Sequence, residues 1–120
     1  MELPKNVVEG QDIVCGYVNV PGEHANPDGD TIRLAVAVIK SPSSDPAPDP
    51  LVVEAGGPGV STLASAPSML ASANLRAQRD IVLVEQRGTR FSEPYLLCEE
   101  ILDLVTKMLG QNLSRVDAPT

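Results

Sequence analysis

The sequence predicts an α/β fold in which antiparallel first strands lead into a parallel sheet flanked by helices. Two apolar runs, Leu51–Val53 and Ile81–Val84, are short, β-branched and free of charge, as strands buried on both faces of a parallel sheet are. Each run ends in a segment rich in turn-forming residues. Because ligands bind at the carboxyl ends of the strands in such sheets, we expect the chemistry of this chain in those two segments.

The amino-terminal part predicts two strands. Residues 12–20 read as a first strand, which a Pro-Gly pair ends. Residues 23–30 are dense in Asn, Pro, Asp and Gly and lead directly into a second strand over Thr31–Ile39. The simplest arrangement is an antiparallel pair joined by this loop. Period-two alternation in the second strand places one set of side chains on a common face: Ile32, Leu34, Val36 and Val38.

A proline-rich segment and two helices complete the predicted elements. Residues 41–50 carry four prolines among Ser, Asp and Ala, which predicts an extended surface loop, although a domain linker has a similar composition. Ser65 is predicted to cap a helix that runs to about Ala77, so that strand, turn, helix and strand follow one another. A second helix is predicted from Cys98, with Gly110 as its stop.

Composition limits the classes of function. The chain has 120 residues, 42% of them hydrophobic, and a formal net charge of -7, which is typical of one small globular domain at most. Its acidity and scattered Lys and Arg residues oppose binding to nucleic acid or to an anionic membrane. No apolar stretch approaches the roughly 18 residues that cross a bilayer, and Met1 to Lys5 lack the apolar core of a signal peptide. We therefore expect a soluble chain.

The cysteines leave two alternatives open. Cys15 and Cys98 allow one internal disulfide, and two free thiols are the other reading. A bridge would indicate an oxidising compartment and an exported protein. Two cysteines and the single histidine, His24, at such wide spacing form no zinc-binding pattern, so no metal site is predicted.

The glycine turn, residues 55–59, follows the first apolar run. Acyl transfer builds negative charge on a carbonyl oxygen, and backbone N–H groups fixed nearby stabilise that charge. Glycines let the backbone approach the oxygen closely and also permit positive φ. Pro58 has no N–H, so the candidate donors are Gly56 and Gly57, with the amides at 59–60 further along. A tight corner without chemistry is the alternative.

The second motif, residues 85–94, follows the second apolar run. With other segments it resembles the N-terminal part of an α/β-hydrolase, in particular of the proline iminopeptidase and tripeptidyl aminopeptidase group of serine peptidases. The resemblance extends from about Cys15 to Leu109. It rests on the order and spacing of these segments: Cys15-Gly16, Val20-Pro21, the turn at 26–29, the strand at 31–36, Gly56-Gly57-Pro58-Gly59 and Val84-Glu85-Gln86-Arg87-Gly88-Thr89.

The resemblance implies that residues 1–120 are the N-terminal segment of an α/β-hydrolase domain, with the remainder of the domain and any cap absent. It implies an aminopeptidase that releases N-terminal residues or short peptides through an acyl-enzyme, without metal or cofactor. Gly56, with Gly57 as its neighbour, would contribute to the oxyanion hole. Three residues depart from the family pattern in ways that concern loop packing: Ala55 replaces a histidine, Glu85 an aspartate and Arg90 a glycine.

Two alternatives remain beside the peptidase reading. The fold alone equally allows an esterase or lipase-like hydrolase. A non-catalytic fragment or interaction module is the alternative from another class. Too few helices are predicted to cover both faces of the sheet, so apolar surface should be exposed. The expected partners are therefore the remainder of the hydrolase domain or a complementary chain, with a peptide or small ester as substrate.

No catalytic residue is predicted within the chain. The sequence contains no Gly-x-Ser-x-Gly, the segment that presents the nucleophile, so Ser, Asp and His are expected downstream. Ser61 has one glycine of such an elbow but follows the wrong strand, and His24 lies in an early turn and is expected at the surface. Asp80 and Asp103 are expected on solvated faces.

Three further charged residues, Glu99, Glu100 and Arg87, are not predicted to be catalytic. Glu99 and Glu100 are adjacent, so on a helix they diverge and form no acid-base pair. Arg87 is expected to bind loop carbonyls, or a carboxylate such as Glu85 or Glu93. Pro58, Gly59 and the segment from Glu85 to Gly88 are expected to shape the two loops.

Overall fold

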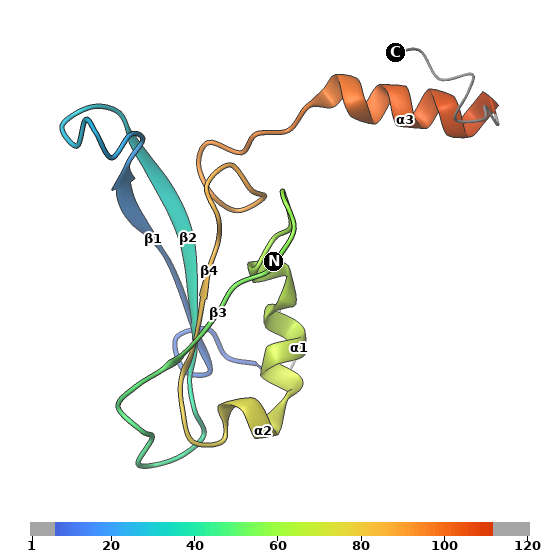
Figure 1. The fold of residues 1–120 in the computed structure, drawn as a ribbon. Coiled ribbons are helices and arrows are strands. Elements are labelled where there is room, and N and C mark those ends of the chain that lie inside the picture. Colours follow the sequence, from blue (N-terminus) through green and yellow to red (C-terminus); the bar gives the residue numbers. More distant parts are fainter. Residues whose placement is uncertain (1–6, 112–120) are drawn as a thin grey trace.

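The structure, a computed structural model, describes residues 7–111 and contains one mixed four-stranded sheet (Figure 1). The predicted strands all form, but the expectation that Leu51–Val53 is buried on both faces is wrong: this strand lies at the edge of the sheet, where Leu51 and Val52 are 37% and 58% exposed. β1 (Ile13–Pro21) and β2 (Thr31–Ile39) are antiparallel, while β3 (Leu51–Val53) and β4 (Ile81–Val84) are parallel. β2 also pairs antiparallel with β4, which gives the strand order β1-β2-β4-β3. Met1 to Lys5, which lack the apolar core of a signal peptide, lie outside the described residues.

The core lies on one face of the sheet. In β2 the buried residues are Ala35, Ala37 and Ile39, and the helical segment after β3 packs on them. Small alanine side chains let that segment approach the sheet closely. The other members of the core come from the neighbouring strands and from the helical segment: Ile13, Leu63, Ala66, Leu70, Ile81 and Leu83.

The opposite face, called here the valine face, is not covered by the described residues. The four alternating residues of β2 do share this face, but they are only half-buried, so the larger side chains of β2 lie outside the core. Val38 lies opposite Val14 of β1 and Val82 of β4, which continues the apolar surface across three strands. Val14, Val18 and Val52 on this face are 47%, 49% and 58% exposed. The expected exposure of apolar surface is therefore confirmed.

The helical segment between β3 and β4 differs from the single capped helix predicted. It begins with a 3-10 turn, η1 (Leu63–Ser65), followed by α1 (Ala66–Ala71) and α2 (Ala73–Arg76). Ser65 is already helical and caps nothing, because its Oγ donates to the Thr62 carbonyl at 2.6 Å. Ser72, with ψ of 88°, leaves the helical region and breaks the segment.

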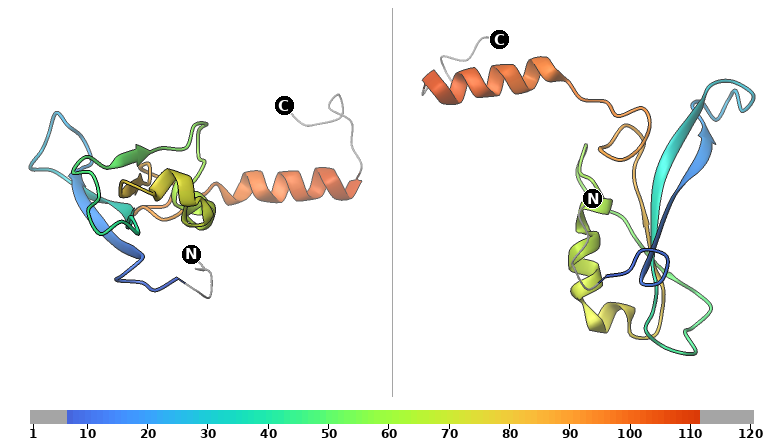
Figure 2. Two further views of the ribbon diagram at one scale, coloured as in Figure 1. Left: turned by 90° about the horizontal axis from the view of Figure 1, so that it is seen from below. Right: turned by 180° about the vertical axis from the view of Figure 1, so that it is seen from behind.

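The last described element, α3 (Glu99–Gln111), extends away from the sheet (Figures 1 and 2). Gly110 does not stop it, contrary to prediction, because this glycine lacks the positive φ of a terminating residue. All the apolar residues of α3 except the half-buried Met108 are exposed: Ile101, Leu102, Leu104, Val105 and Leu109. Among residues 7–111, no helix combines the length and apolar character needed to cross a membrane.

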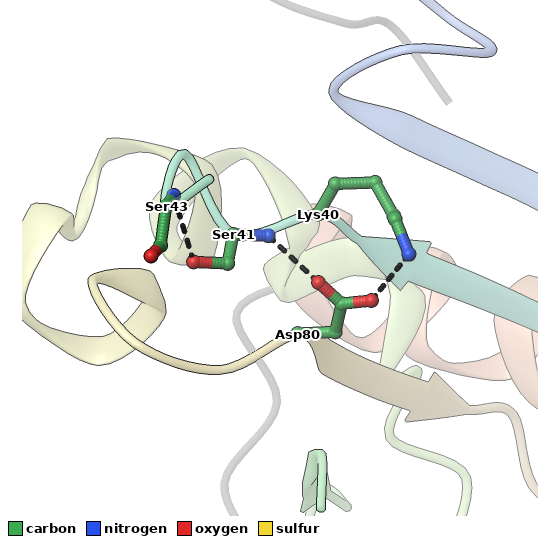
Figure 3. A network of polar contacts seen from close by, with 4 residues as sticks. All are labelled: Lys40, Ser41, Ser43 and Asp80. Carbon is green, nitrogen blue, oxygen red and sulfur yellow. Dashed lines mark hydrogen bonds and ion pairs between the residues drawn. The ribbon is translucent and has the colours of Figure 1, made fainter. Parts of the chain in front are cut away.

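The segment 41–50 is an irregular surface loop, as predicted, and it is fastened to the connection between α2 and β4. Asp80 accepts hydrogen bonds from Lys40 Nζ and from the Ser41 amide, the latter at 2.8 Å, and the Ser43 amide donates to Ser41 Oγ at 3.1 Å (Figure 3). The expectation that Asp80 only occupies a solvated face is therefore wrong. Its carboxylate fixes the end of β2 to the start of β4.

Asp80→Asn is expected to lower the free energy of unfolding by about 1 kcal/mol at neutral pH, because it weakens charge-assisted hydrogen bonds. The hydrogen bond from Lys40, with that from the Ser41 amide, holds the pKa of Asp80 below its usual value. The stabilisation is therefore fully present above the unfolded-state pKa of about 4 and is lost as pH falls through the lower folded-state pKa. Urea unfolding between about pH 7 and pH 2 measures this dependence.

The matched control is Asp45→Asn, in the same loop, since within residues 7–111 the Asp45 side chain makes no hydrogen bond or ion pair. We expect this control to leave the unfolding midpoint unchanged. Equal acid sensitivity in wild type and Asp80→Asn would contradict the prediction.

Candidate functional site

The glycine turn and the second motif leave the same edge of the sheet. β3 ends at Val53 and β4 at Val84, and the two strands are parallel neighbours. The carboxyl ends of both strands therefore lie side by side, as expected from the sequence. This edge is the candidate functional site.

The backbone of the glycine turn combines two kinds of glycine. Gly57 and Gly59 have φ of 95° and 78°, a left-handed conformation that favours glycine. Gly56 does not have positive φ, and a Cβ added there would meet nothing within 4 Å. In the part of the chain that the structure describes, the Gly56 and Gly57 N–H groups donate no hydrogen bond. These two amides are therefore free to bind an acceptor from a ligand.

A buried carboxylate ties the glycine turn to the second motif. Glu85 is fully buried, and its Oε2 accepts hydrogen bonds from the Leu63 amide at 2.9 Å and from Ser61 Oγ at 3.2 Å. Its Oε1 lies 2.7 Å from Thr89 Oγ1, whose single proton is shared between this carboxylate and the Gln86 carbonyl at 2.8 Å. One side chain thus connects the residues that follow the glycine turn with the second motif.

The start of the glycine turn is held as well. The Ala55 amide donates to Thr62 Oγ1, and Gln86 Nε2 donates to the Ala55 carbonyl, both at 3.2 Å. Thr62 is fully buried, so its hydroxyl is a fixed part of the structure. The Ala55 amide and carbonyl therefore both have hydrogen-bond partners. The bond to Thr62 closes the start of the glycine turn onto the residues that follow the turn. Sequence reasoning missed Thr62, since a single Thr before a helix carries no pattern that reveals its partner.

The rest of the second motif shapes the loop around the site. Arg87 Nη1 donates to the Gly22 carbonyl at 2.8 Å, which confirms the predicted bond to a loop carbonyl. The predicted carboxylate alternative for Arg87 is wrong, because Glu93 pairs with Arg33 Nη1 at 2.8 Å and Glu85 binds hydroxyls and an amide.

Gly88→Ala is expected to destabilise the protein by about 1 to 2 kcal/mol, because Gly88 has a left-handed φ of 77°; the exposed Leu96 side chain, 2.9 Å from the added Cβ, can move aside. The urea midpoint measures this loss. Gly16→Ala is the matched control: a Cβ at Gly16 meets nothing within 4 Å and its φ is not positive. Equal midpoints for the two variants would contradict the role assigned to Gly88.

The described residues assemble no catalytic triad. Ser61 Oγ donates to Glu85 and accepts from the Ala64 amide at 3.1 Å, so its hydroxyl is used within the fold. His24 is exposed in the loop between β1 and β2 and makes none of the hydrogen bonds or ion pairs found in residues 7–111. The prediction that Asp103 is solvated is confirmed, and Glu99 and Glu100 lie in the first turn of α3, as expected for a helix there. No group of three or more His, Cys, Asp or Glu suited to a metal ion occurs among the described residues.

Both cysteines are free and exposed, so of the two alternatives left open for Cys15 and Cys98 the structure has the free thiols and not the bridge. The physical reason is their placement: Cys15 lies within β1, whereas Cys98 directly precedes α3, which extends away from the sheet, and donates to Glu100 at 3.4 Å. Although Cys15 is exposed as a residue, its thiol is partly removed from water. This partial burial, and after it the negative charge of Glu9, raise the pKa of the Cys15 thiol. A hollow of about 380 Å³ beside Cys15 reaches Leu63 but includes no residue of the glycine turn.

Comparison with known proteins relates the chain to a serine protease. Over 92 residues it is 32% identical to serine protease Hip1 of Mycobacterium tuberculosis (strain ATCC 25618 / H37Rv) and to the protein of the same name from Mycobacterium bovis (strain ATCC BAA-935 / AF2122/97). The match covers 75% of this chain and 17% of either relative. The chain therefore spans less than a fifth of the length of the curated relatives it matches. No family model matches the sequence.

Proposed function

We propose that the chain is the N-terminal segment of an α/β-hydrolase of the proline iminopeptidase and tripeptidyl aminopeptidase group, and that it supplies the oxyanion-hole turn. The observation that carries this proposal is the pair of free amides, Gly56 and Gly57, in a closed turn at the carboxyl end of β3. The similarity to a serine protease supports it. So does the antiparallel first strand pair that leads into parallel strands.

In the proposed reaction a serine oxygen from the expected downstream triad bonds to the carbonyl carbon of the substrate while the triad histidine takes the serine proton. The carbonyl oxygen becomes negatively charged, and the Gly56 amide donates a hydrogen bond to it, with Gly57 beside it. One such donor contributes roughly 3 to 4 kcal/mol to the stabilisation of the transition state. The amine then leaves with a proton from the histidine, and water releases the acyl group from the serine.

The substrate we propose is a peptide with a free amino terminus, from which a residue or short peptide is released. The complete protein should hydrolyse an unblocked aminoacyl or tripeptidyl anilide, and acetylation of the amino terminus should strongly reduce the rate. Equal rates on the blocked substrate would contradict the aminopeptidase proposal and leave an endopeptidase. A preference for simple esters would favour the esterase alternative, which the fold alone equally allows.

A non-catalytic interaction module is the second candidate function, and the uncovered valine face favours it. That face and the exposed apolar residues of α3 need a covering surface. In the hydrolase proposal the remainder of the domain or a complementary chain covers them. A fluorophosphonate, which labels activated serines, distinguishes the two functions: the complete protein should be labelled at one serine, whereas an interaction module should not react.

A further inference from the structure

We propose that Glu85 is a positioning residue, whose carboxylate holds the glycine turn in the geometry that its free amides need to act as oxyanion donors. This inference rests on the proposed function. It concerns a residue of the second motif, which itself carries no donor to the substrate.

The surroundings of Glu85 set it apart from an ordinary acidic residue. Its side chain is fully buried, and in residues 7–111 no Lys or Arg forms an ion pair with it. A buried carboxylate costs several kcal/mol unless hydrogen bonds replace its hydration. Here neutral donors replace it: the Leu63 amide and the Ser61 hydroxyl from the segment after β3, and, after β4, the Thr89 hydroxyl, whose proton is shared with the Gln86 carbonyl.

The hydrogen bonds of Glu85 reach the glycine turn through Thr62. Its Oε2 binds Ser61 and Leu63, which flank Thr62, and Thr62 in turn receives the Ala55 amide. Loss of the carboxylate would free both flanking residues and, through Thr62, the start of the turn. A displacement of about 1 Å in a positioned group can cost on the order of 100-fold in rate.

The test compares variants of the complete protein on the peptide anilide. Glu85→Ala should lower kcat by about 10- to 100-fold with KM changed less than about twofold, because the donors act in the transition state. Glu85→Gln should restore most of kcat, since its amide oxygen still accepts from Leu63 and Ser61. Glu93→Ala is the matched control: this glutamate lies in the same motif but is exposed and paired with Arg33, and kcat should not change.

Amide hydrogen exchange provides a second readout, independent of activity. In Glu85→Ala the amides of Leu63 and Ala55, which donate to Glu85 and to Thr62, should exchange faster, whereas those of Ala37 and Leu83 in the sheet should not change. Unchanged kcat would overturn the proposal, and so would equally faster exchange in the sheet, which would make Glu85 a general support of the fold.

Two further outcomes are also decisive. If Glu85→Ala does not fold, Glu85→Met, which keeps the volume and removes the acceptors, takes its place. Failure of both to fold while Glu85→Gln folds would overturn the positioning role. If the wild-type protein shows no hydrolase activity, the proposed function fails, and the exchange data alone then decide whether Glu85 holds the turn.

Discussion

Gly56→Val is expected to lower kcat of the complete protein by a factor on the order of 10²–10³, with a smaller effect on KM. The valine side chain would stand where the acyl oxygen must approach the turn, and the N–H donor would be displaced or screened. The transition state would lose this interaction more than the bound substrate would.

The structure makes this a clean test, because Gly56 is not required by the fold. It lacks positive φ, and a Cβ there has free space, whereas Gly57 and Gly59 have left-handed backbones. Gly56→Val should therefore unfold at the same urea concentration as wild type. Arg90→Ala and Glu93→Ala serve as controls that should act mainly on stability. Near-normal kcat in a folded Gly56→Val protein would contradict the catalytic role of the glycine turn and leave it only a structural turn.

Residues 1–120 expressed alone are expected to show no hydrolase activity. The sequence holds no Gly-x-Ser-x-Gly, and the hydroxyl of Ser61 is bound to Glu85 rather than to a base. His24, the single histidine, lies in the exposed loop between β1 and β2. Without a nucleophile and a base, only binding and oxyanion stabilisation remain.

The measurement is turnover of a chromogenic ester and of an aminoacyl anilide by the purified segment, with Ser61→Ala as the matched variant. Turnover that Ser61→Ala abolishes would show that Ser61 is a nucleophile and would contradict the proposed downstream triad. Turnover that survives in Ser61→Ala would point to a contaminating hydrolase, which a fluorophosphonate label identifies by its mass.

The sequence by itself determined the elements that depend on local pattern. The bounds of β2 agree with prediction, and β1 begins one residue later than expected. Alternation, β-branched runs and turn residues are properties of a few neighbouring residues, so they can be read without knowledge of the fold. The edge that holds the site was predictable for the same reason, since parallel strands bring their carboxyl ends together.

Only the tertiary structure decided which surfaces and side chains meet. Alternation in β2 identified two faces but not the buried one, because that choice depends on where the helical segment packs, and it packs on the alanines. The role of Glu85 was equally hidden: its partners lie up to 24 residues away in sequence, and no local pattern specifies them. Burial gives that carboxylate its importance, because a group removed from water depends on every hydrogen bond that the fold supplies.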